Sequence, residues 1–439
     1  MKALVVFSIP LIIGNFFQQT YTMVDALVVG RYVSEDALAA IGASYAFTNI
    51  FIWMAVGGGI GASVIVSHHF GARRYGEMRS AVYTALLSFL AVSLVLCGLG
   101  FLVGRPIMTL LRTPASAMEP AMVYLKIYFL GLPFLFMYNV ISAMFNAIGM
   151  SRIPLYFLIF SSVLNIGLDV WMVVSLGLGV AGVAWATLIA QGLSAVISFL
   201  VLRRTVRRFG PDQEAVLFSL REAGKMMAVA IPSIVQQSTV SIGMMIVQSV
   251  VNGFGASALA GYSAGMRIEN YCCVPWGAFN NAMSSYTAQN IGSGKDERVR
   301  QGYKAVLVLI AIFSAAMFLI MEPLAGTFVR MFLGRNLTEE ALRAGTSYIR
   351  CDGIFVGILG VKMAQDALLR GAQDTRAFTI ANLVNLGIRI ILSFTLAPVV
   401  GIQMVWYASP IGWTANYLIS WSHLRKTKYG RKAALKGGD

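Results

Sequence analysis

The chain has little charge and few of the residues that bind metals or form disulfides. Only 12% of its 439 residues are charged, and it contains 3 histidines and 4 cysteines. A soluble domain normally carries about 25% charged residues, so this composition argues against a soluble globular protein. The cysteines fall in apolar stretches without metal-ligand spacing, and we interpret them as packing residues.

Apolar residues dominate instead, in runs long enough to cross a bilayer. Hydrophobic residues make up 57% of the chain, and a membrane-spanning helix needs about 20 of them in succession. The pattern predicts an all-α integral membrane protein with twelve transmembrane helices. The predicted spans lie near residues 5–30, 40–67, 80–104, 121–147, 154–175, 179–202, 226–252, 257–287, 303–330, 341–368, 377–398 and 400–423.

The spans form two sets of six that resemble each other. Pro10 corresponds to Pro232, and Asn165 to Asn385, at an offset that stays close to 220 residues. An even number of spans per repeat gives both lobes the same orientation, related by a pseudo-two-fold axis along the membrane normal. The predicted divisions are an N-terminal six-helix lobe at 1–202, a cytoplasmic linker at 203–225, a C-terminal six-helix lobe at 226–424 and a basic cytoplasmic tail at 425–439.

The distribution of the basic residues behind the formal net charge of +15 indicates membrane topology rather than a surface that binds nucleic acid. Lysine and arginine cluster in alternate loops, such as 73–79, 203–208 and 295–300, and in the tail, whereas the intervening loops carry few basic residues. This positive-inside pattern places both termini in the cytoplasm. We therefore predict a multi-pass plasma-membrane protein in contact with membrane lipid and not with nucleic acid.

Polar side chains in the first lobe predict a pocket at bilayer depth. Gln18, Tyr21 and Asp25 recur at spacings of three and four, so they share one helix face. Asn165 and Asp169 lie four apart in the fifth span. Ionisable groups at this depth are costly and usually line a functional cavity. Two carboxylates close together in low dielectric cannot both ionise freely, so one should hold a proton or bind a cation.

Thr187 on the sixth span adds a hydroxyl to the same bundle. Carboxylate, amide and hydroxyl groups suit either H⁺ or Na⁺. A Na⁺ ion would be held by Asp25, Asn165, Asp169 and Thr187. The alternative interpretation is that Asp25 only cross-links helices.

The second lobe shares the scaffold but not the charge. Arg389 occupies the position that matches Asp169, and the candidates to line a cleft are Gln236, Arg267, Glu269 and Arg389. The charged members could face the cleft or could form a self-paired structural network. We favour the structural network, because opposite charges at depth usually neutralise each other.

Glycines in the second span suit close helix packing. The run that contains Gly57 and Gly61 is not followed by the Gly-Lys-Ser/Thr of a phosphate-binding loop, and no strand precedes it. Glycines four apart allow two helix backbones to approach closely. We therefore predict that this face contacts another helix.

In the order of its motifs, the chain resembles the multidrug and toxic compound extrusion (MATE) transporters over nearly its whole length. The matching stretches are Pro10 to Arg31 with its Gln18–Tyr21–Asp25 series, Ala37-Leu38-Ala39-Ala40, Gly265-Met266-Arg267-Ile268-Glu269, Gln289-Asn290-Ile291-Gly292 and Leu369-Arg370-Gly371. The resemblance implies a monomeric, twelve-helix antiporter that expels organic cations in exchange for H⁺ or Na⁺.

The DinF-like branch is the most similar part of that family. Its ion site has a Gln, a Tyr and an Asp on the first helix, an Asn and an Asp on the fifth and a Thr on the sixth. These match Gln18, Tyr21, Asp25, Asn165, Asp169 and Thr187.

Two other functions were weighed against an ion-coupled exporter. A lipid-linked saccharide flippase of the same superfamily would line its cleft with basic residues, whereas the matched pocket here is acidic. An integral-membrane enzyme would need a nucleophile–base pair or a metal cluster, and the sequence offers no pattern for either. No nucleotide-binding motif or cofactor motif is present, so energy would come from an ion gradient.

Overall fold

Helices form almost all of the chain in the computed structural model. It describes residues 2–33, 35–110, 113, 115–209, 215–334 and 338–427, without the side chains of residues 2, 3, 21–32, 35–39, 43, 46, 115 and 116. Those ranges contain no strand. A helix satisfies its backbone hydrogen bonds within one segment, which hydrocarbon requires. Eight helices in the described ranges are long and apolar enough to cross a membrane.

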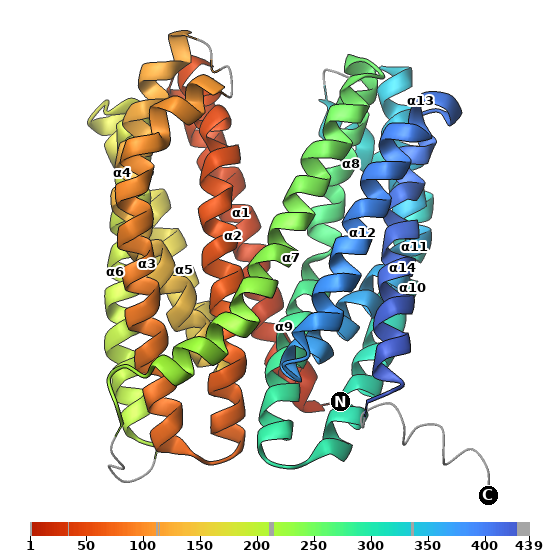
Figure 1. The fold of residues 1–439 in the computed structure, drawn as a ribbon. Helices are drawn as coiled ribbons and strands as arrows, with labels where there is room; N and C mark the ends of the chain where they lie inside the picture. Colours follow the sequence, from red (N-terminus) through yellow and green to blue (C-terminus); the bar gives the residue numbers. More distant parts are fainter. Residues whose placement is uncertain are drawn as a thin grey trace, which may run out of the picture. The chain divides into compact units, whose positions relative to one another are not determined.

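The described chain divides into two compact units (Figure 1). The N-terminal unit runs from Ile9 to Ile234, and the C-terminal unit contains the described residues from Val235 onward together with those up to Ser8. The divisions therefore fall inside the first and the seventh helix, α1 and α7, each of which passes from one unit into the other.

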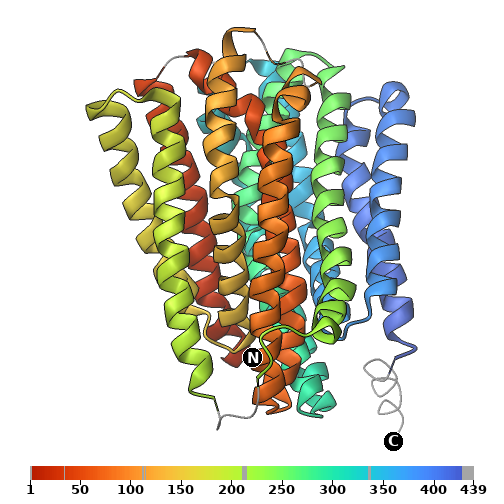
Figure 2. The ribbon, with the colours of Figure 1, turned by 60° about the vertical axis from the view of Figure 1, so that its left-hand side comes forward.

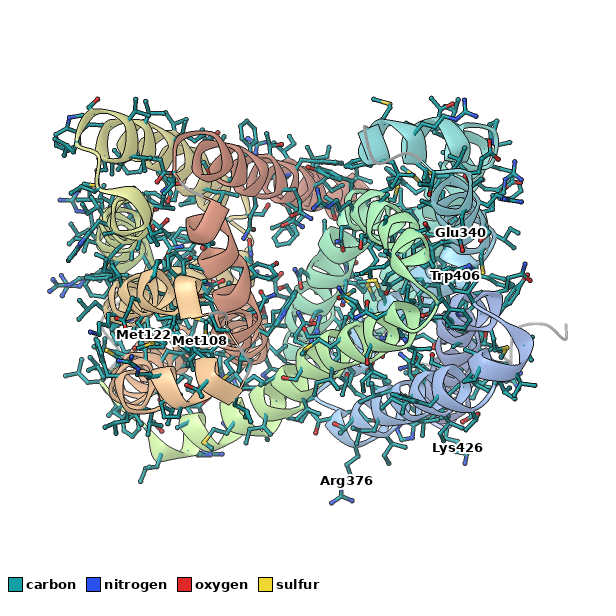
Figure 3. The ribbon with its side chains drawn as sticks, turned by 90° about the horizontal axis from the view of Figure 1, so that it is seen from above. Met108, Met122, Glu340, Arg376, Trp406 and Lys426 are labelled. Carbon is teal, nitrogen blue, oxygen red and sulfur yellow. The ribbon has the colours of Figure 1, made fainter. Side chains whose placement is uncertain are left out.

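In the N-terminal unit, α4 is central and packs against α2, α3 and α6, while α5 lies against α6 (Figure 2). Phe47, Phe51 and Phe129 meet edge to face in its core. Met108 and Met122 belong to the same core (Figure 3). The elements are α1 (Lys2–Tyr32), α2 (Glu35–Gly71), α3 (Tyr75–Leu110), α4 (Ala115–Ala147), α5 (Arg152–Asp169), the π-helix η1 (Val170–Ser175) and α6 (Gly179–Arg207).

In the C-terminal unit, α11 takes the equivalent central place and packs against α8, α9, α10 and α14. Tyr262, Tyr348 and Trp406 form an aromatic cluster among α8, α11 and α14, with ring centroids 5.0–5.5 Å apart. The elements are α7 (Leu220–Asn252), α8 (Ala256–Cys272), α9 (Val274–Gly292), α10 (Asp296–Leu333), α11 (Glu339–Gly371), α12 (Thr375–Thr395), α13 (Ala397–Val400) and α14 (Gln403–Leu424).

Two spans expected to be continuous α-helices are interrupted. The fifth becomes a π-helix directly after Asp169. The eighth breaks at Cys273 between α8 and α9, where Pro275 lies in the first turn of α9 and cannot continue a preceding helix. Neither interruption can be predicted from the apolar pattern, because both halves of each span remain apolar.

The start of α7 is bound to the ends of α2 and α3 in the N-terminal unit. His69 is 3% exposed and lies between two carboxylates, with Nε2 2.9 Å from Glu222 and Nδ1 3.2 Å from Glu77. Lys225 Nζ lies 2.6 Å from the other oxygen of Glu222. Charged groups buried at this point are thus paired, and they hold α7 in place.

Gly57 and Gly61 of α2 face α7 within the same unit, which confirms the predicted close packing. A Cβ at Gly57 would lie 2.9 Å from backbone atoms of Ile234, and one at Gly61 would lie 2.3 Å from the Cα of Ala230. A side chain at either position would displace α7.

We expect the substitution Gly61→Leu to destabilise the protein by about 1–3 kcal/mol, because it overpacks a backbone contact. The thermal unfolding midpoint in detergent measures the effect. Gly98→Leu is the control: Gly98 lies on an exposed part of α3, and a Cβ there meets nothing within 4 Å. Equal midpoints for the two variants would contradict the contact.

Candidate functional site

Three of the predicted ion-site residues come together within the N-terminal unit. Asn165 and Asp169 are 2% and 1% exposed on the last two turns of α5, and Thr187 is half-buried on α6. In one orientation of its amide, Asn165 donates from Nδ2 to Thr187 Oγ1 at 3.4 Å. With the amide turned over, Nδ2 donates to Asp169 Oδ2 at 3.3 Å. The second orientation joins the amide to the carboxylate and uses its hydrogen-bonding capacity better.

The π-helix η1 begins directly after Asp169. A π-helical turn is wider than an α-helical one and occurs frequently at functional sites. The chain then turns into α6 through Gly177 and Gly179, whose φ angles of +63° and +55° strongly favour glycine. The short connection holds α5 and α6 together, so Asp169 and Thr187 stay on facing helices.

The remaining predicted ion-site residues lie on α1. Gln18 is exposed. The side chains of Tyr21 and Asp25 lie outside the described residues, although the backbone of α1 is helical through Tyr32. Within the described side chains, no group of three His, Cys, Asp or Glu residues has the arrangement of a metal site. The assignment of Asp25, Asn165, Asp169 and Thr187 to a Na⁺ site stays a prediction.

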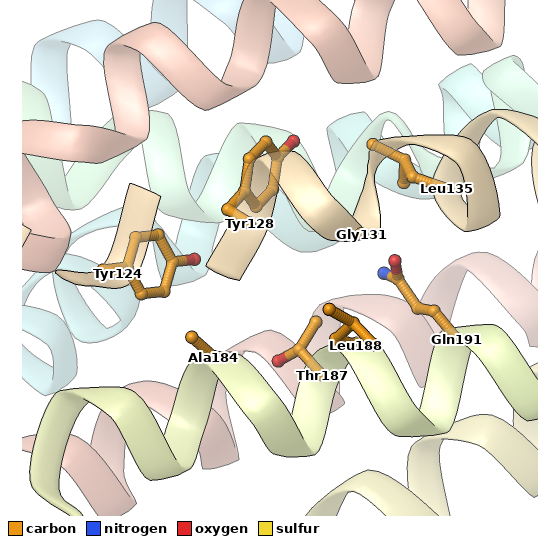
Figure 4. Close-up of a pocket in the computed structure, with 8 residues that line it drawn as sticks. All are labelled: Tyr124, Tyr128, Gly131, Leu135, Ala184, Thr187, Leu188 and Gln191. Atoms are coloured by element: carbon orange, nitrogen blue, oxygen red, sulfur yellow. The ribbon is translucent and has the colours of Figure 1, made fainter. Parts of the chain in front are cut away.

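A small pocket of about 20 Å³ lies between α4 and α6 and reaches Thr187 (Figure 4). Tyr124 and Tyr128 from α4 stack with ring centroids 6.2 Å apart, and the Tyr128 hydroxyl donates to the Thr48 carbonyl at 3.1 Å. Gln191 extends from α6 toward α4. The other lining residues are Gly131, Leu135, Ala184 and Leu188.

Sequence reasoning missed this aromatic pocket. Tyr124 and Tyr128 lie four apart in an apolar span, and Gln191 lies one turn after Thr187 on the same helix face. These spacings could have indicated the pocket. Thr187 lines the pocket and also contacts Asn165, so the pocket and the acidic pair share a residue.

A second buried polar network lies in the C-terminal unit. Asp366 is fully buried, with Lys362 Nζ 2.6 Å from its carboxylate. Gln236 and Asn382 donate to the same carboxylate at 3.4 Å. Lys362 also donates to the Asn382 side-chain carbonyl at 2.9 Å.

Arg370 lies one turn further along α11 and is 1% exposed. It donates to Asn280 Oδ1 at 2.8 Å, to Ser284 Oγ at 3.3 Å and to Gln236 Oε1 at 3.4 Å. The predicted cleft residue Gln236 thus bridges Asp366 and Arg370. The network thus contains two cations, Lys362 and Arg370, and one anion, Asp366. Lys362 pairs with Asp366, whereas Arg370 is bound by neutral oxygen atoms.

The other second-lobe candidates occupy separate surroundings. Glu269 accepts a hydrogen bond from the Tyr348 hydroxyl, whereas Arg267 is exposed. Arg389 is half-buried and lies beside Gly243 and Gly412, whose missing side chains make room for it. In the described part of the chain, no ion pair within 4.0 Å joins Arg267, Glu269 and Arg389.

The profile of the MatE family matches the chain twice, over residues 10–171 and 232–395. The chain belongs to the MatE family. The two matched stretches are the two halves of the internal repeat. The expected relationship to MATE transporters is therefore confirmed, while the DinF-like branch stays a prediction.

Curated relatives of this MatE protein span most of its length. "Probable multidrug resistance protein YpnP" of Bacillus subtilis is 28% identical over 386 residues, which cover 88% of this chain and 85% of the relative. "Probable multidrug resistance protein NorM" of Thermotoga maritima is 23% identical and covers 85% and 80%. "FAD transporter" of Shewanella oneidensis is 23% identical and covers 74% of each chain.

Solved structures share the fold. A MATE family transporter of the MOP superfamily in an outward-facing conformation has a TM-score of 0.87 at 22% identity and covers 98% of this chain and 96% of that one. A MOP superfamily transporter from Pyrococcus furiosus has a TM-score of 0.85 at 24% identity, with 97% and 95% covered. The predicted all-α, multi-span membrane fold, with twelve spans in two six-helix lobes, is confirmed.

We expect single and double substitutions in the Asp366 network to lower the stability of the protein by different amounts. We expect Asp366→Asn to cost about 3–5 kcal/mol, because it leaves two buried cations without their anion. The double variant Lys362→Met/Asp366→Leu should cost less than Asp366→Asn, because it removes an ion pair and leaves a single cation with neutral partners. Thermal unfolding in detergent measures both, and a double variant less stable than the single one would contradict the pairing.

Proposed function

We propose that this protein is a secondary active multidrug exporter that exchanges organic cations for H⁺ or Na⁺. The observation that carries the proposal is the Asp169–Asn165–Thr187 set, which adjoins a pocket walled by Tyr124 and Tyr128. Relatives named as multidrug resistance proteins support the same reading. Transport of this kind involves no covalent chemistry, so we do not propose an enzyme.

The coupling residues would be Asp25 and Asp169, with Gln18, Tyr21, Asn165 and Thr187 as their hydrogen-bonding shell. A carboxylate in a low-dielectric site attracts a cation strongly, and a bound proton or Na⁺ cancels that attraction. The ring faces of Tyr124 and Tyr128 would attract an organic cation. Because Thr187 belongs to both sites, the coupling ion and the organic cation would compete, as antiport requires.

The wider assignments follow from this function. The protein would act as a monomer in the plasma membrane, with both termini in the cytoplasm, and would use an ion gradient without a cofactor. Its partners would be small organic cations and membrane lipid, not nucleic acid.

The alternative is transport of an anion by the same scaffold, as in a lipid-linked saccharide flippase. The relative named an FAD transporter fits this alternative. The buried cations of the C-terminal unit do not favour it, because Lys362 and Arg370 are 4% and 1% exposed and already hydrogen-bonded. We therefore rank cation export first.

The test is efflux of a fluorescent organic cation from proteoliposomes, driven by a Na⁺ gradient and separately by a pH gradient. We expect Asp169→Asn and Asp25→Asn each to slow gradient-driven efflux about tenfold or more, because each removes a charge-assisted interaction. Glu119→Gln is the matched control, since Glu119 is an exposed carboxylate of the same unit that pairs with Arg105 at 2.8 Å.

Unchanged gradient-driven efflux in both aspartate variants would rule out the coupling role. No cation transport under either gradient, with transport of an anionic lipid-linked sugar, would favour the flippase.

A further inference from the structure

A groove of about 550 Å³ lies on the C-terminal unit between α10, α11 and α14. The groove is lined by the central helix and the last long helix of this unit. The aromatic pocket is lined by the corresponding helices of the N-terminal unit, α4 and α6. The two hollows thus lie at corresponding places in the repeat. Their linings differ, because the groove carries Arg343 and Arg350 and the pocket in the N-terminal unit carries no charge.

The groove is polar at one end and apolar further along. Helices α11 and α14 begin at the same end of the unit, so Arg343 and Gln403 lie near that end. Ile354 lies about 16 Å beyond Arg343 along the helix axis. Ile354 and Tyr407 are 58% and 46% exposed, which is typical of side chains that face lipid. The wall formed by these two side chains suits an acyl chain.

The arginines face the polar part of the groove. Arg343 and Arg350 lie seven residues apart on α11, so they share a face and are separated by about 10 Å along the axis. Thr346 lies between them and offers a hydroxyl group, whereas the Ser347 hydroxyl already donates to the Ala344 carbonyl at 3.0 Å and accepts from Trp406 Nε1 at 3.1 Å. Arg343, Thr346 and Arg350 are therefore the side chains of this part of α11 that can donate hydrogen bonds to a lipid head group.

The residues that line the groove include two arginines and no carboxylate. Arg350 Nε lies 3.4 Å from Glu322 Oε1, in a pair that is 54% and 39% exposed. In the described part of the chain, no carboxylate lies within 4.0 Å of the Arg343 guanidinium, although Glu339 and Glu340 lie in the first turn of α11 (Figure 3).

We propose that this groove binds one anionic phospholipid, with its phosphate between Arg343 and Arg350 and an acyl chain along Ile354 and Tyr407. Basic side chains near a membrane surface attract anionic lipid head groups. The site is separate from the ion pocket, so its occupancy does not depend on the proposed transport function.

Trp406 lines the groove and reports on its occupant. The test uses the full-length protein in phosphatidylcholine vesicles that contain an equal mole fraction of dibrominated phosphatidylglycerol or dibrominated phosphatidylcholine. Because the chain has 7 tryptophans, the signal of Trp406 is the quenching lost in Trp406→Phe. We expect stronger quenching by the anionic lipid, and its displacement by unbrominated phosphatidylglycerol but not by phosphatidylcholine or inorganic phosphate.

Substitutions test the arginines directly. We expect Arg343→Gln and Arg350→Gln each to reduce the preference for the anionic lipid about fivefold. Arg330→Gln is the control, since Arg330 is an exposed arginine near the end of α10 that does not line the groove, and it should keep the preference.

Two results would overturn the proposal. One is equal quenching by the two lipids in the unsubstituted protein, a measurement that needs no variant to fold. The other is displacement by inorganic phosphate as effectively as by phosphatidylglycerol, which would assign the arginines to a free anion.

Discussion

Hydrocarbon provides no hydrogen-bond partners, and the rest of this structure depends on that constraint. Backbone groups at bilayer depth must bond within the chain, so the described residues form helices and no strands. Side chains obey the same rule. Asp366 at full burial has a cation and two amides around it, and Asp169 has the amide of Asn165 within reach. A buried polar residue in a span therefore indicates a polar partner, either one turn away on the same helix or on a neighbouring helix.

The two units satisfy this constraint with different chemistry. In the N-terminal unit the buried acid Asp169 lies within reach of the amide of Asn165, which also contacts Thr187. In the C-terminal unit Asp366 is neutralised by Lys362 at 2.6 Å, and the network carries a cation in excess. A repeat that matches one family profile twice thus contains one buried polar cluster whose three residues include no cation and one that is built around an ion pair.

Much of the fold was predictable because membrane helices leave strong local signals. Apolar length, the repeated Pro10 and Pro232, and the Gly57–Gly61 spacing are all properties of one segment. The grouping of Asn165, Asp169 and Thr187 was predictable because their helices are adjacent in sequence. Contacts such as Tyr348 with Glu269 were not, since the partners lie 79 residues apart and only packing brings them together. The Arg370 network was missed for the same reason: Arg370, Asn280 and Ser284 are unremarkable alone.

Prolines stand where the chain passes between the two units. The division falls after Ser8 in α1 and after Ile234 in α7, close to Pro10 and Pro232. A proline has no amide hydrogen, so the carbonyls of Val6 and Ala228 lack the usual helical partner. A helix can bend at such a point without breaking a hydrogen bond. The two helices that connect the units therefore each contain a bending point, at corresponding positions of the repeat. Bending there would leave the other backbone hydrogen bonds of α1 and α7 formed, because the bond that proline cannot make is already missing.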